Sequence, residues 1–387
     1  MVVAGESFDI LPTWPMSATD PINACLPPAD RSTGLLGTAL SSPRIAGLDF
    51  LRALAVLTVL VAHSVVNGSN PGVPLDGVEL FFVISGFLIT WLLLLEFEAS
   101  GTVSFGAFFR RRAARLLPPF YAYLVISLAY LAWRDKPIPW GAVGAACAYV
   151  VNYYQALTGA PTHFLSHCWS LAVEEQFYFL WPFALLFLMR KGIRLENALI
   201  GAILFVWALR PLLYLGLHVS DEYVYRALET RADHLAAGCL LAVLLRKPVV
   251  LAFVERCARN WVVVSSLLLL LLLSRALDAS LAYKYSVGFA IEALLMAVLI
   301  PIVILLAQGP GWAAALINTP VLVLMGEASY GIYLFHPMLM SPVAHGVEGL
   351  THSSVVGMLA SIAVVMLVAL ASLRFFENPI RRRFRGR

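Results

Sequence analysis

The feature that most constrains this chain is a series of apolar runs that recurs from about residue 45 to the C-terminus. A helix that spans a bilayer needs about 20 mostly apolar residues. Hydrophobic residues make up 60% of the 387 residues and charged residues only 13%, which excludes a soluble globular, disordered or collagen-like chain. The sequence therefore predicts an all-α fold, a polytopic transmembrane helix bundle.

About ten stretches are long and apolar enough to be spanning helices. They cover residues 45–67, 78–97, 116–133, 171–189, 197–217, 232–246, 260–275, 285–307, 321–341 and 354–374. The segment 140–156 is also apolar, but it is short and ends in the polar run from Asn152 to Gln155. These properties favour an interfacial or re-entrant element, although the sequence leaves a further span open.

The basic residues predict the orientation of the bundle. With ten spans and a cytoplasmic N-terminus, four basic segments all face the cytoplasm, as the positive-inside rule requires. They are Arg110–Arg115, Arg190–Arg194, Arg246–Lys247 and Arg381–Arg387. Eleven spans would displace the later basic loops, so we expect a multi-pass protein of the bacterial cytoplasmic (inner) membrane with both termini in the cytoplasm.

The remaining composition predicts few further features. Residues 1–43 are rich in proline and small polar residues and lack the pattern of a signal peptide, so we expect a flexible cytoplasmic tail, followed by a transmembrane domain over 44–380 and a basic tail over 381–387. The five cysteines show no CxxC or Cys/His metal spacing and are expected to be isolated thiols, with no metal site. The net charge of +4 is explained by arginines at helix ends and indicates no nucleic-acid partner.

The first apolar stretch carries polar residues on one face. Arg52 and His63 are eleven positions apart, which is three helical turns plus about 20° and about 16 Å along the axis. Asp49 lies three residues before Arg52 and is expected to pair with it. An imidazole can accept a proton from a hydroxyl and return it to a leaving group, as acyl transfer requires. The alternative is a histidine that only packs between helices.

The second stretch begins with another acidic group. In a simple hairpin, Glu79 and His63 lie at similar depth, which would allow a base and its orienting carboxylate. Ser85 and Gly86 are small and are expected to permit close helix contact.

Further ionisable residues are expected at the outer level of the bundle. Glu174 and Glu175 open the fourth stretch, and two adjacent carboxylates at a membrane entrance are costly unless they are hydrated or paired. Three later stretches bring more such groups to the same depth, namely Arg231, Asp233, Glu292 and His336. A purely structural bundle is not expected to collect so many.

Seven segments together resemble the acyltransferase-3 family of polytopic membrane O-acyltransferases, over about residues 44–380. The first is the Arg52-to-His63 spacing. The others are DGVELFFVISGFLI (76–89), FFRRRAARLLPPF (108–120), HCWSLAVEEQFYFLWP (167–182), TRADHLAAG (230–238), ASYGIYLFHP (328–337) and FFENPIRR (375–382). The family more often has aspartate where this chain has Glu79.

The resemblance implies roles for particular residues. His63 is the expected catalytic residue, supported by Glu79 and Glu174. The anionic donor is expected to bind to five arginines: Arg52, Arg110, Arg111, Arg112 and Arg115. The acceptor is expected to contact His167, Trp169, Glu175, Arg231, Asp233, Tyr330 and His336. The structural alternatives are topology anchoring for the arginines, interfacial anchoring for Glu174 and Trp169, and packing for Tyr330 and His336.

The resemblance also implies the reaction. The family moves an acyl group, commonly acetyl, from cytoplasmic acyl-CoA to a hydroxyl of a carbohydrate or natural product. The expected partners are therefore acyl-CoA as a substrate, a hydroxyl-bearing acceptor and the lipid bilayer, with no tightly bound cofactor. His63 would act as a general base or carry the acyl group, and the sequence does not choose between them. A transporter and a catalytically silent scaffold are the alternatives; the chain shows no clear repeat of the kind common in transporters.

Overall fold

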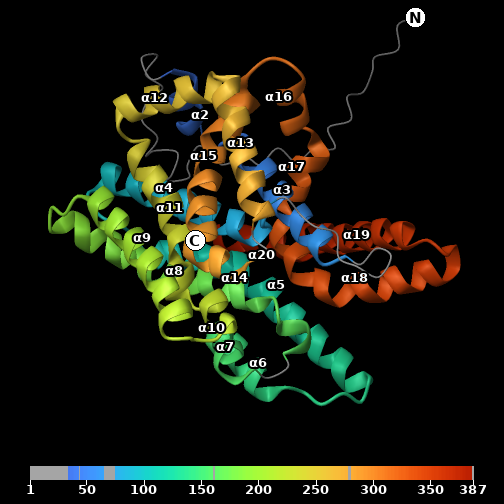
Figure 1. The fold of residues 1–387 in the computed structure, drawn as a ribbon. Coiled ribbons are helices and arrows are strands. Elements are labelled where there is room, and N and C mark those ends of the chain that lie inside the picture. Colours follow the sequence, from blue (N-terminus) through green and yellow to red (C-terminus); the bar gives the residue numbers. More distant parts are fainter. Residues whose placement is uncertain (1–33, 43, 65–74, 160–161, 278–279, 386–387) are drawn as a thin grey trace, which may run out of the picture.

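A computed structural model describes residues 34–42, 44–64, 75–159, 162–277 and 280–385, and every regular element in these ranges is helical (Figure 1). The N-terminal half contains α2 (Gly34–Leu40), α3 (Leu48–Ala62), α4 (Gly77–Ser100), α5 (Phe105–Trp133), α6 (Trp140–Cys147), α7 (Val151–Thr158), α8 (Cys168–Arg190) and α9 (Leu195–Pro211). The middle contains α10 (Asp221–Arg226), α11 (Leu228–Leu244), α12 (Pro248–Arg259), α13 (Trp261–Ala276) and α14 (Leu281–Tyr283). The remainder contains α15 (Phe289–Gln308), α16 (Trp312–Ile317), α17 (Pro320–Glu327), α18 (Ser329–Thr351), α19 (Ser354–Ala371) and α20 (Asn378–Arg385).

The all-helical prediction is confirmed for the described residues, but the count of about ten spans is not. Within the described ranges, six helical segments are long and apolar enough to cross a membrane, or seven if the bent pair Asp221–Leu244 and Pro248–Arg259 counts as one span. They are Gly77–Ser100, Phe105–Trp133, Cys168–Arg190, Leu195–Gly216, Leu281–Gln308 and Ser354–Arg383. Helix α3 falls short because it has only 15 residues, about 22 Å of helix.

The segment 140–156 forms two short helices, α6 and α7, of eight residues each. Tyr149, between them, has a left-handed backbone (φ 53°), which ends the first helix. Each helix is about 12 Å long, so neither crosses a bilayer alone.

Helix α4 is the central helix of the bundle. Its start is fixed by Asp76, whose side chain accepts hydrogen bonds from the backbone N–H groups of Val78 and Glu79. It packs against α3, α8, α11 and α15. The contact with α11 is close because Gly86 faces the backbone of Leu235 and Gly238 faces that of Val83; a Cβ at either glycine would overlap that backbone. The expectation of a close helix contact at Gly86 is therefore met.

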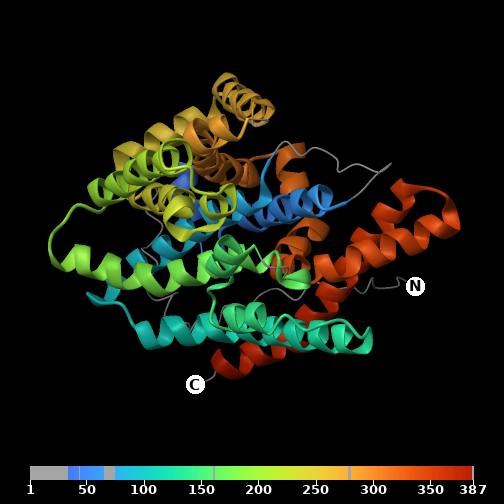
Figure 2. The ribbon, with the colours of Figure 1, turned by 60° about the horizontal axis from the view of Figure 1, so that its bottom comes forward.

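The first and last described helices, α2 and α20, pack onto this bundle. Leu36, Ala39 and Leu40 of α2 are buried in the core, so the folded domain begins before residue 44; residues 1–33 of the expected tail lie outside the described residues. Figure 2 shows the red C-terminal helix α20 beside the teal helix α5. Helices α18 and α19 lie side by side and project from one side of the bundle (Figure 1).

Candidate active site

Three histidines from three helices meet on one side of the bundle. His63 caps the C-terminus of α3, His167 precedes α8, and His336 lies in α18. The ring centroids of His63 and His336 are 4.9 Å apart, and those of His167 and His336 are 5.4 Å apart. Burial and the neighbouring His63 lower the pKa of His167 to about 3, so this imidazole is neutral at ordinary pH.

The backbone selects the tautomer of two of these rings. The Nδ1 atom of His63 lies 2.9 Å from the carbonyl oxygen of Val59, and the Nδ1 atom of His336 lies 2.6 Å from that of Tyr333. A carbonyl oxygen only accepts, so Nδ1 carries a hydrogen in both rings, and in the neutral form of each ring Nε2 has the lone pair. The arrangement gives His63 a nitrogen that can accept a proton.

His63 and His336 line a cavity of 580 Å³ between α3, α5 and α18. Its other walls are formed by Tyr130, Leu131, Arg134, Lys136, Phe164, Ser166, Pro337, Met340 and Ser341. We call this space the histidine cavity. Its volume is in the range of small-molecule sites, and its lining contains two cations and no carboxylate.

A second, smaller cavity of 80 Å³ collects the arginines. Arg52, Arg112 and Arg115 line it together with Glu174, and we call it the arginine cavity. Arg52 pairs with Asp49 at 3.0 Å, as its spacing predicted.

The other polar groups of the arginine cavity are held in place. The guanidinium of Arg112 lies 3.3 Å over the ring of Tyr178, whose hydroxyl donates to Ser85. Ser85 in turn donates to Glu174 at 2.8 Å, so this serine has a polar contact beyond the packing role expected of it. Tyr330 also lines the cavity and donates to the carbonyl of Leu116.

Tyr333 and Ser170 connect the wall of the arginine cavity with the three histidines. Both residues line the arginine cavity, and their hydroxyl oxygens are 2.6 Å apart. The hydroxyl of Tyr333 also lies 3.1 Å from the carbonyl of His167, and its ring is 5.4 Å from that of His336. The two cavities share no lining residue, but Tyr333 lines the first and its ring lies near that of His336, which lines the second.

A third space, of 390 Å³, lies on the other side of Arg112 and Tyr178. Glu175 lines it, together with Tyr149 and Gln176. The two adjacent carboxylates of α8 therefore line different spaces, because Glu174 lines the arginine cavity.

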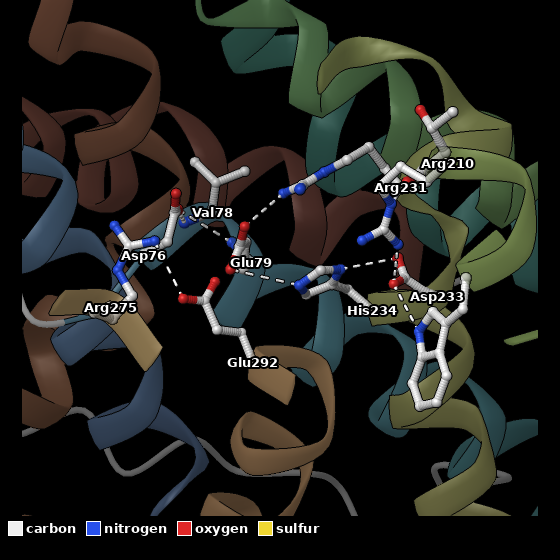
Figure 3. Close-up of polar contacts among 11 residues, drawn as sticks. Asp76, Val78, Glu79, Arg210, Arg231, Asp233, His234, Arg275 and Glu292 are labelled. Atoms are coloured by element: carbon white, nitrogen blue, oxygen red, sulfur yellow. Dashed lines mark hydrogen bonds and ion pairs between the residues drawn. The ribbon is translucent and has the colours of Figure 1, made fainter. Parts of the chain in front are cut away.

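Figure 3 shows a buried charge network that joins α4, α9 and α11. Arg231 donates to Glu79 at 3.0 Å, and the Nε2 atom of His234 lies 3.4 Å from the same carboxylate. His234 also bonds to Asp233, which pairs with Arg210. Glu292 of α15 pairs with Arg275 nearby.

This network gives Glu79 partners other than the expected His63. Glu79, Arg231, Asp233 and His234 are fully buried, and none of them lines the three cavities. Buried charges are tolerated only when they are paired. The ion pairs between these residues therefore hold α4 against α11.

Three other residues expected in the site lie apart from the cavities. Arg110 and Arg111 are exposed, and Arg111 lies 3.7 Å from Glu96. Trp169 is 7% exposed and packs against Phe82 and Tyr225. A ring in this position has no free face for stacking on a sugar.

Sequence reasoning did not single out Tyr333, Ser170, Arg210 and His234. Arg210 could have been found from the sequence, because a charged residue inside an apolar helix is expected to have a function or a charged partner. Tyr333 lies three residues before His336, a spacing that places both on one helix face. Nothing in the sequence indicates that Ser170 contacts Tyr333.

The fold and these cavities define a polytopic membrane protein with histidine and arginine sites inside a helix bundle. A family model described as an acyltransferase domain matches residues 45–374. The chain therefore belongs to the acyltransferase-3 family, as its motifs indicated.

Curated relatives support this membership. The chain is 29% identical over 362 residues to the peptidoglycan O-acetyltransferase OatA of Listeria monocytogenes, covering 89% of this chain and 57% of the relative. It is 32% identical over 358 residues to a putative O-acetyltransferase of Staphylococcus aureus strain COL, covering 87% of this chain and 57% of the relative. It is 30% identical over 362 residues to the O-acetyltransferase OatA of Staphylococcus aureus strain NCTC 8325, covering 88% of this chain and 58% of the relative. The chain thus spans somewhat more than half the length of these relatives. No solved structure matches it.

Proposed function

We propose that the chain is a membrane O-acyltransferase that moves an acyl group, acetyl in the first instance, from acyl-CoA to a hydroxyl of a carbohydrate or glycosylated natural product. The observation that carries the proposal is the Nε2 of His63, which has no hydrogen-bond partner among the described residues and lies at a cavity large enough for a sugar. The names of the relatives support acetyl as the group, and one name specifies peptidoglycan as the acceptor. We place the protein in the bacterial cytoplasmic membrane with both termini in the cytoplasm.

The acceptor enters the histidine cavity and presents its hydroxyl to His63. The Nε2 atom takes the hydroxyl proton while the oxygen attacks the thioester carbonyl. The C–S bond then breaks, the new ester leaves with the acceptor, and the imidazolium returns the proton to the CoA thiolate. The backbone carbonyl of Val59 keeps the Nδ1–H in place throughout.

A covalent route uses the same atoms in a different order. His63 Nε2 attacks the thioester carbonyl, the C–S bond breaks, and CoA leaves as the thiolate. The acyl-imidazolium then transfers its acyl group to the acceptor hydroxyl, whose proton ends on the CoA thiolate. His336, 4.9 Å away with its own free Nε2, is placed to take the acceptor proton in this second step.

The donor binds from the arginine side. Guanidinium groups bind phosphate with paired hydrogen bonds, and Arg52, Arg112 and Arg115 supply three of them around one space. At 80 Å³ that space is too small for a pantetheine arm. Donor binding therefore requires the cavity to widen and the contact between Ser170 and Tyr333 to open toward His63.

One assay separates an enzyme from a transporter and from a silent scaffold. The purified full chain in lipid nanodiscs is incubated with acetyl-CoA labelled in the acetyl group and with N-acetylmuramic acid or an oligosaccharide acceptor. An enzyme releases free CoA in an acceptor-dependent way and forms labelled ester in equal amount. Neither product above the protein-free rate would contradict the proposal, whatever the protein binds.

A further inference from the structure

Two cations lie on the wall of the histidine cavity. Arg134 and Lys136 follow the end of α5 and line the same space as His63. Within the described ranges the structure records no ion pair for either, and no acidic residue lines the cavity. The cavity therefore carries two positive charges that the protein does not neutralise there.

The backbone fixes the position of this pair. Helix α5 ends in a turn with two backbone hydrogen bonds. The N–H of Lys136 donates to the carbonyl of Leu131 at 2.9 Å, and the N–H of Asp135 donates to the carbonyl of Ala132 at 3.2 Å. Asp135 has a left-handed backbone (φ 49°). This is the Schellman arrangement of a helix C-terminus, so the two cations flank a closed turn of fixed geometry.

Membrane topology does not account for the pair. Arg134 lies 24 residues after Arg110 in sequence, which is about 36 Å of helix and more than the hydrocarbon thickness of a bilayer. The cluster Arg110–Arg115 and the pair Arg134 and Lys136 thus lie at opposite ends of α5. The positive-inside rule concentrates basic residues on one side only, and the arginine cluster already meets it.

We propose that the histidine cavity selects an acceptor that carries an oxyanion, a carboxylate or a phosphate, and that Arg134 and Lys136 bind this group while the acceptor hydroxyl faces His63. The inference rests on the proposed function for the identity of the cavity as the acceptor site. Charge-assisted hydrogen bonds from two cations give affinity and fix the sugar in one orientation. Arg134 and Lys136 are then specificity-determining residues, distinct from the proton-accepting His63.

Binding measured on the full chain in nanodiscs tests the inference without requiring turnover. N-Acetylmuramic acid and N-acetylglucosamine differ by one carboxylate-bearing substituent, and N-acetylglucosamine 1-phosphate tests phosphate instead. We expect each anionic sugar to bind about tenfold or more tightly than the neutral sugar, since hydrogen bonds to charged groups contribute about 1.5–3 kcal/mol. The double variant Arg134→Gln/Lys136→Gln should remove this preference and leave binding of the neutral sugar within about twofold.

The matched control is Lys191→Gln, an exposed cation in the loop after α8 that lines none of the cavities. It should keep the wild-type preference. Equal binding of the charged and neutral sugars by the wild type, or an unchanged preference in the double variant, would overturn the inference.

The same preparation separates this inference from the proposed function. Charge-dependent binding without any acceptor-dependent release of CoA would leave the anion site standing and remove the transferase proposal. Suppose instead that the enzyme transfers acetyl to neutral and anionic sugars with equal KM and that the double variant has the same KM values. The transferase proposal would then stand and the anion site would be removed. The double variant is also compared in nanodiscs with phosphatidylglycerol and in nanodiscs of phosphatidylcholine alone. If it loses affinity for the anionic sugars only when phosphatidylglycerol is present, the cations bind lipid headgroups and the inference is overturned.

Discussion

The hydroxyl oxygens of Tyr333 and Ser170 are 2.6 Å apart in the wall of the arginine cavity, and the ring of Tyr333 lies 5.4 Å from that of His336 in the wall of the histidine cavity. Tyr333 belongs to the helix that carries His336, and Ser170 to the helix that carries Glu174. Under the proposed function, a donor bound in the arginine cavity would meet an acceptor from the histidine cavity only when this contact opens. The pair would then control whether water or acceptor reaches the thioester.

The first prediction concerns this contact. Tyr333→Phe removes the hydroxyl that contacts both Ser170 and the carbonyl of His167. Under the proposed function it should raise the rate of acetyl-CoA hydrolysis without acceptor, because a passage to the histidine cavity would open more often. Loss of these two buried hydrogen bonds should lower the free energy of unfolding by about 2 kcal/mol. CoA release without acceptor is the measurement, and Tyr121→Phe, an exposed tyrosine of α5, is the control. Equal hydrolysis by both variants would show that the contact is no barrier.

The second prediction separates donor binding from topology anchoring within one basic segment. Arg115 lines the arginine cavity and Arg110 does not. Arg115→Gln should raise the KM for acetyl-CoA about tenfold or more, since it removes a charged phosphate contact. Arg110→Gln should leave the KM within about twofold. If the arginines only anchor the helix, the two variants would behave alike, and steady-state kinetics would show it.

The third prediction concerns the buried charge network. Glu79→Gln leaves Arg231 without its charged partner inside the protein, and breaking a buried pair in this way costs about 3–5 kcal/mol. Glu98→Gln removes the partner of Arg246 at an exposed site and should cost about 1 kcal/mol or less. Thermal unfolding in one detergent compares them. A midpoint for Glu79→Gln as high as that for Glu98→Gln would refute the structural role of the network.

The fourth prediction concerns pH. The pKa of His167 in the folded chain is about 3, below its ordinary 6.5, so between these values the unfolded chain binds a proton that the folded chain does not. Stability is therefore lost as the pH falls below 6.5. His167→Gln should reduce this loss, and unfolding midpoints between pH 7 and pH 4 measure it. His218→Asn, at an exposed histidine, should lose stability with falling pH as the wild type does. If the unfolding midpoint of His167→Gln falls with pH as steeply as those of both other proteins, His167 is not the source of this loss.

Local spacing predicted some contacts well. The pair of Asp49 and Arg52 forms because three residues in a helix bring side chains onto one face. The close approach at Gly86 follows from the absence of a side chain there. The all-helical class follows from the length and composition of the apolar runs.

Longer-range relations were not predictable in the same way. The hairpin estimate placed Glu79 beside His63 by depth alone, whereas the rotation of α4 directs the carboxylate toward α11 and Arg231. The count of about ten spans is not confirmed, because apolar composition alone does not distinguish a long helix from a short one such as α3. Trp169 has the residue type of a sugar platform, but its neighbours Phe82 and Tyr225 bury it.

The most direct test of the account is single-turnover transfer of labelled acetyl from acetyl-CoA to N-acetylmuramic acid by His63→Asn. Asparagine can still donate to the carbonyl of Val59 but has no basic nitrogen to accept the hydroxyl proton. We predict a fall in rate of about a hundredfold or more, with donor binding unchanged and with His218→Asn at the wild-type rate. Transfer by His63→Asn at the wild-type rate would contradict the assignment of His63 as the group that accepts the proton or carries the acyl group.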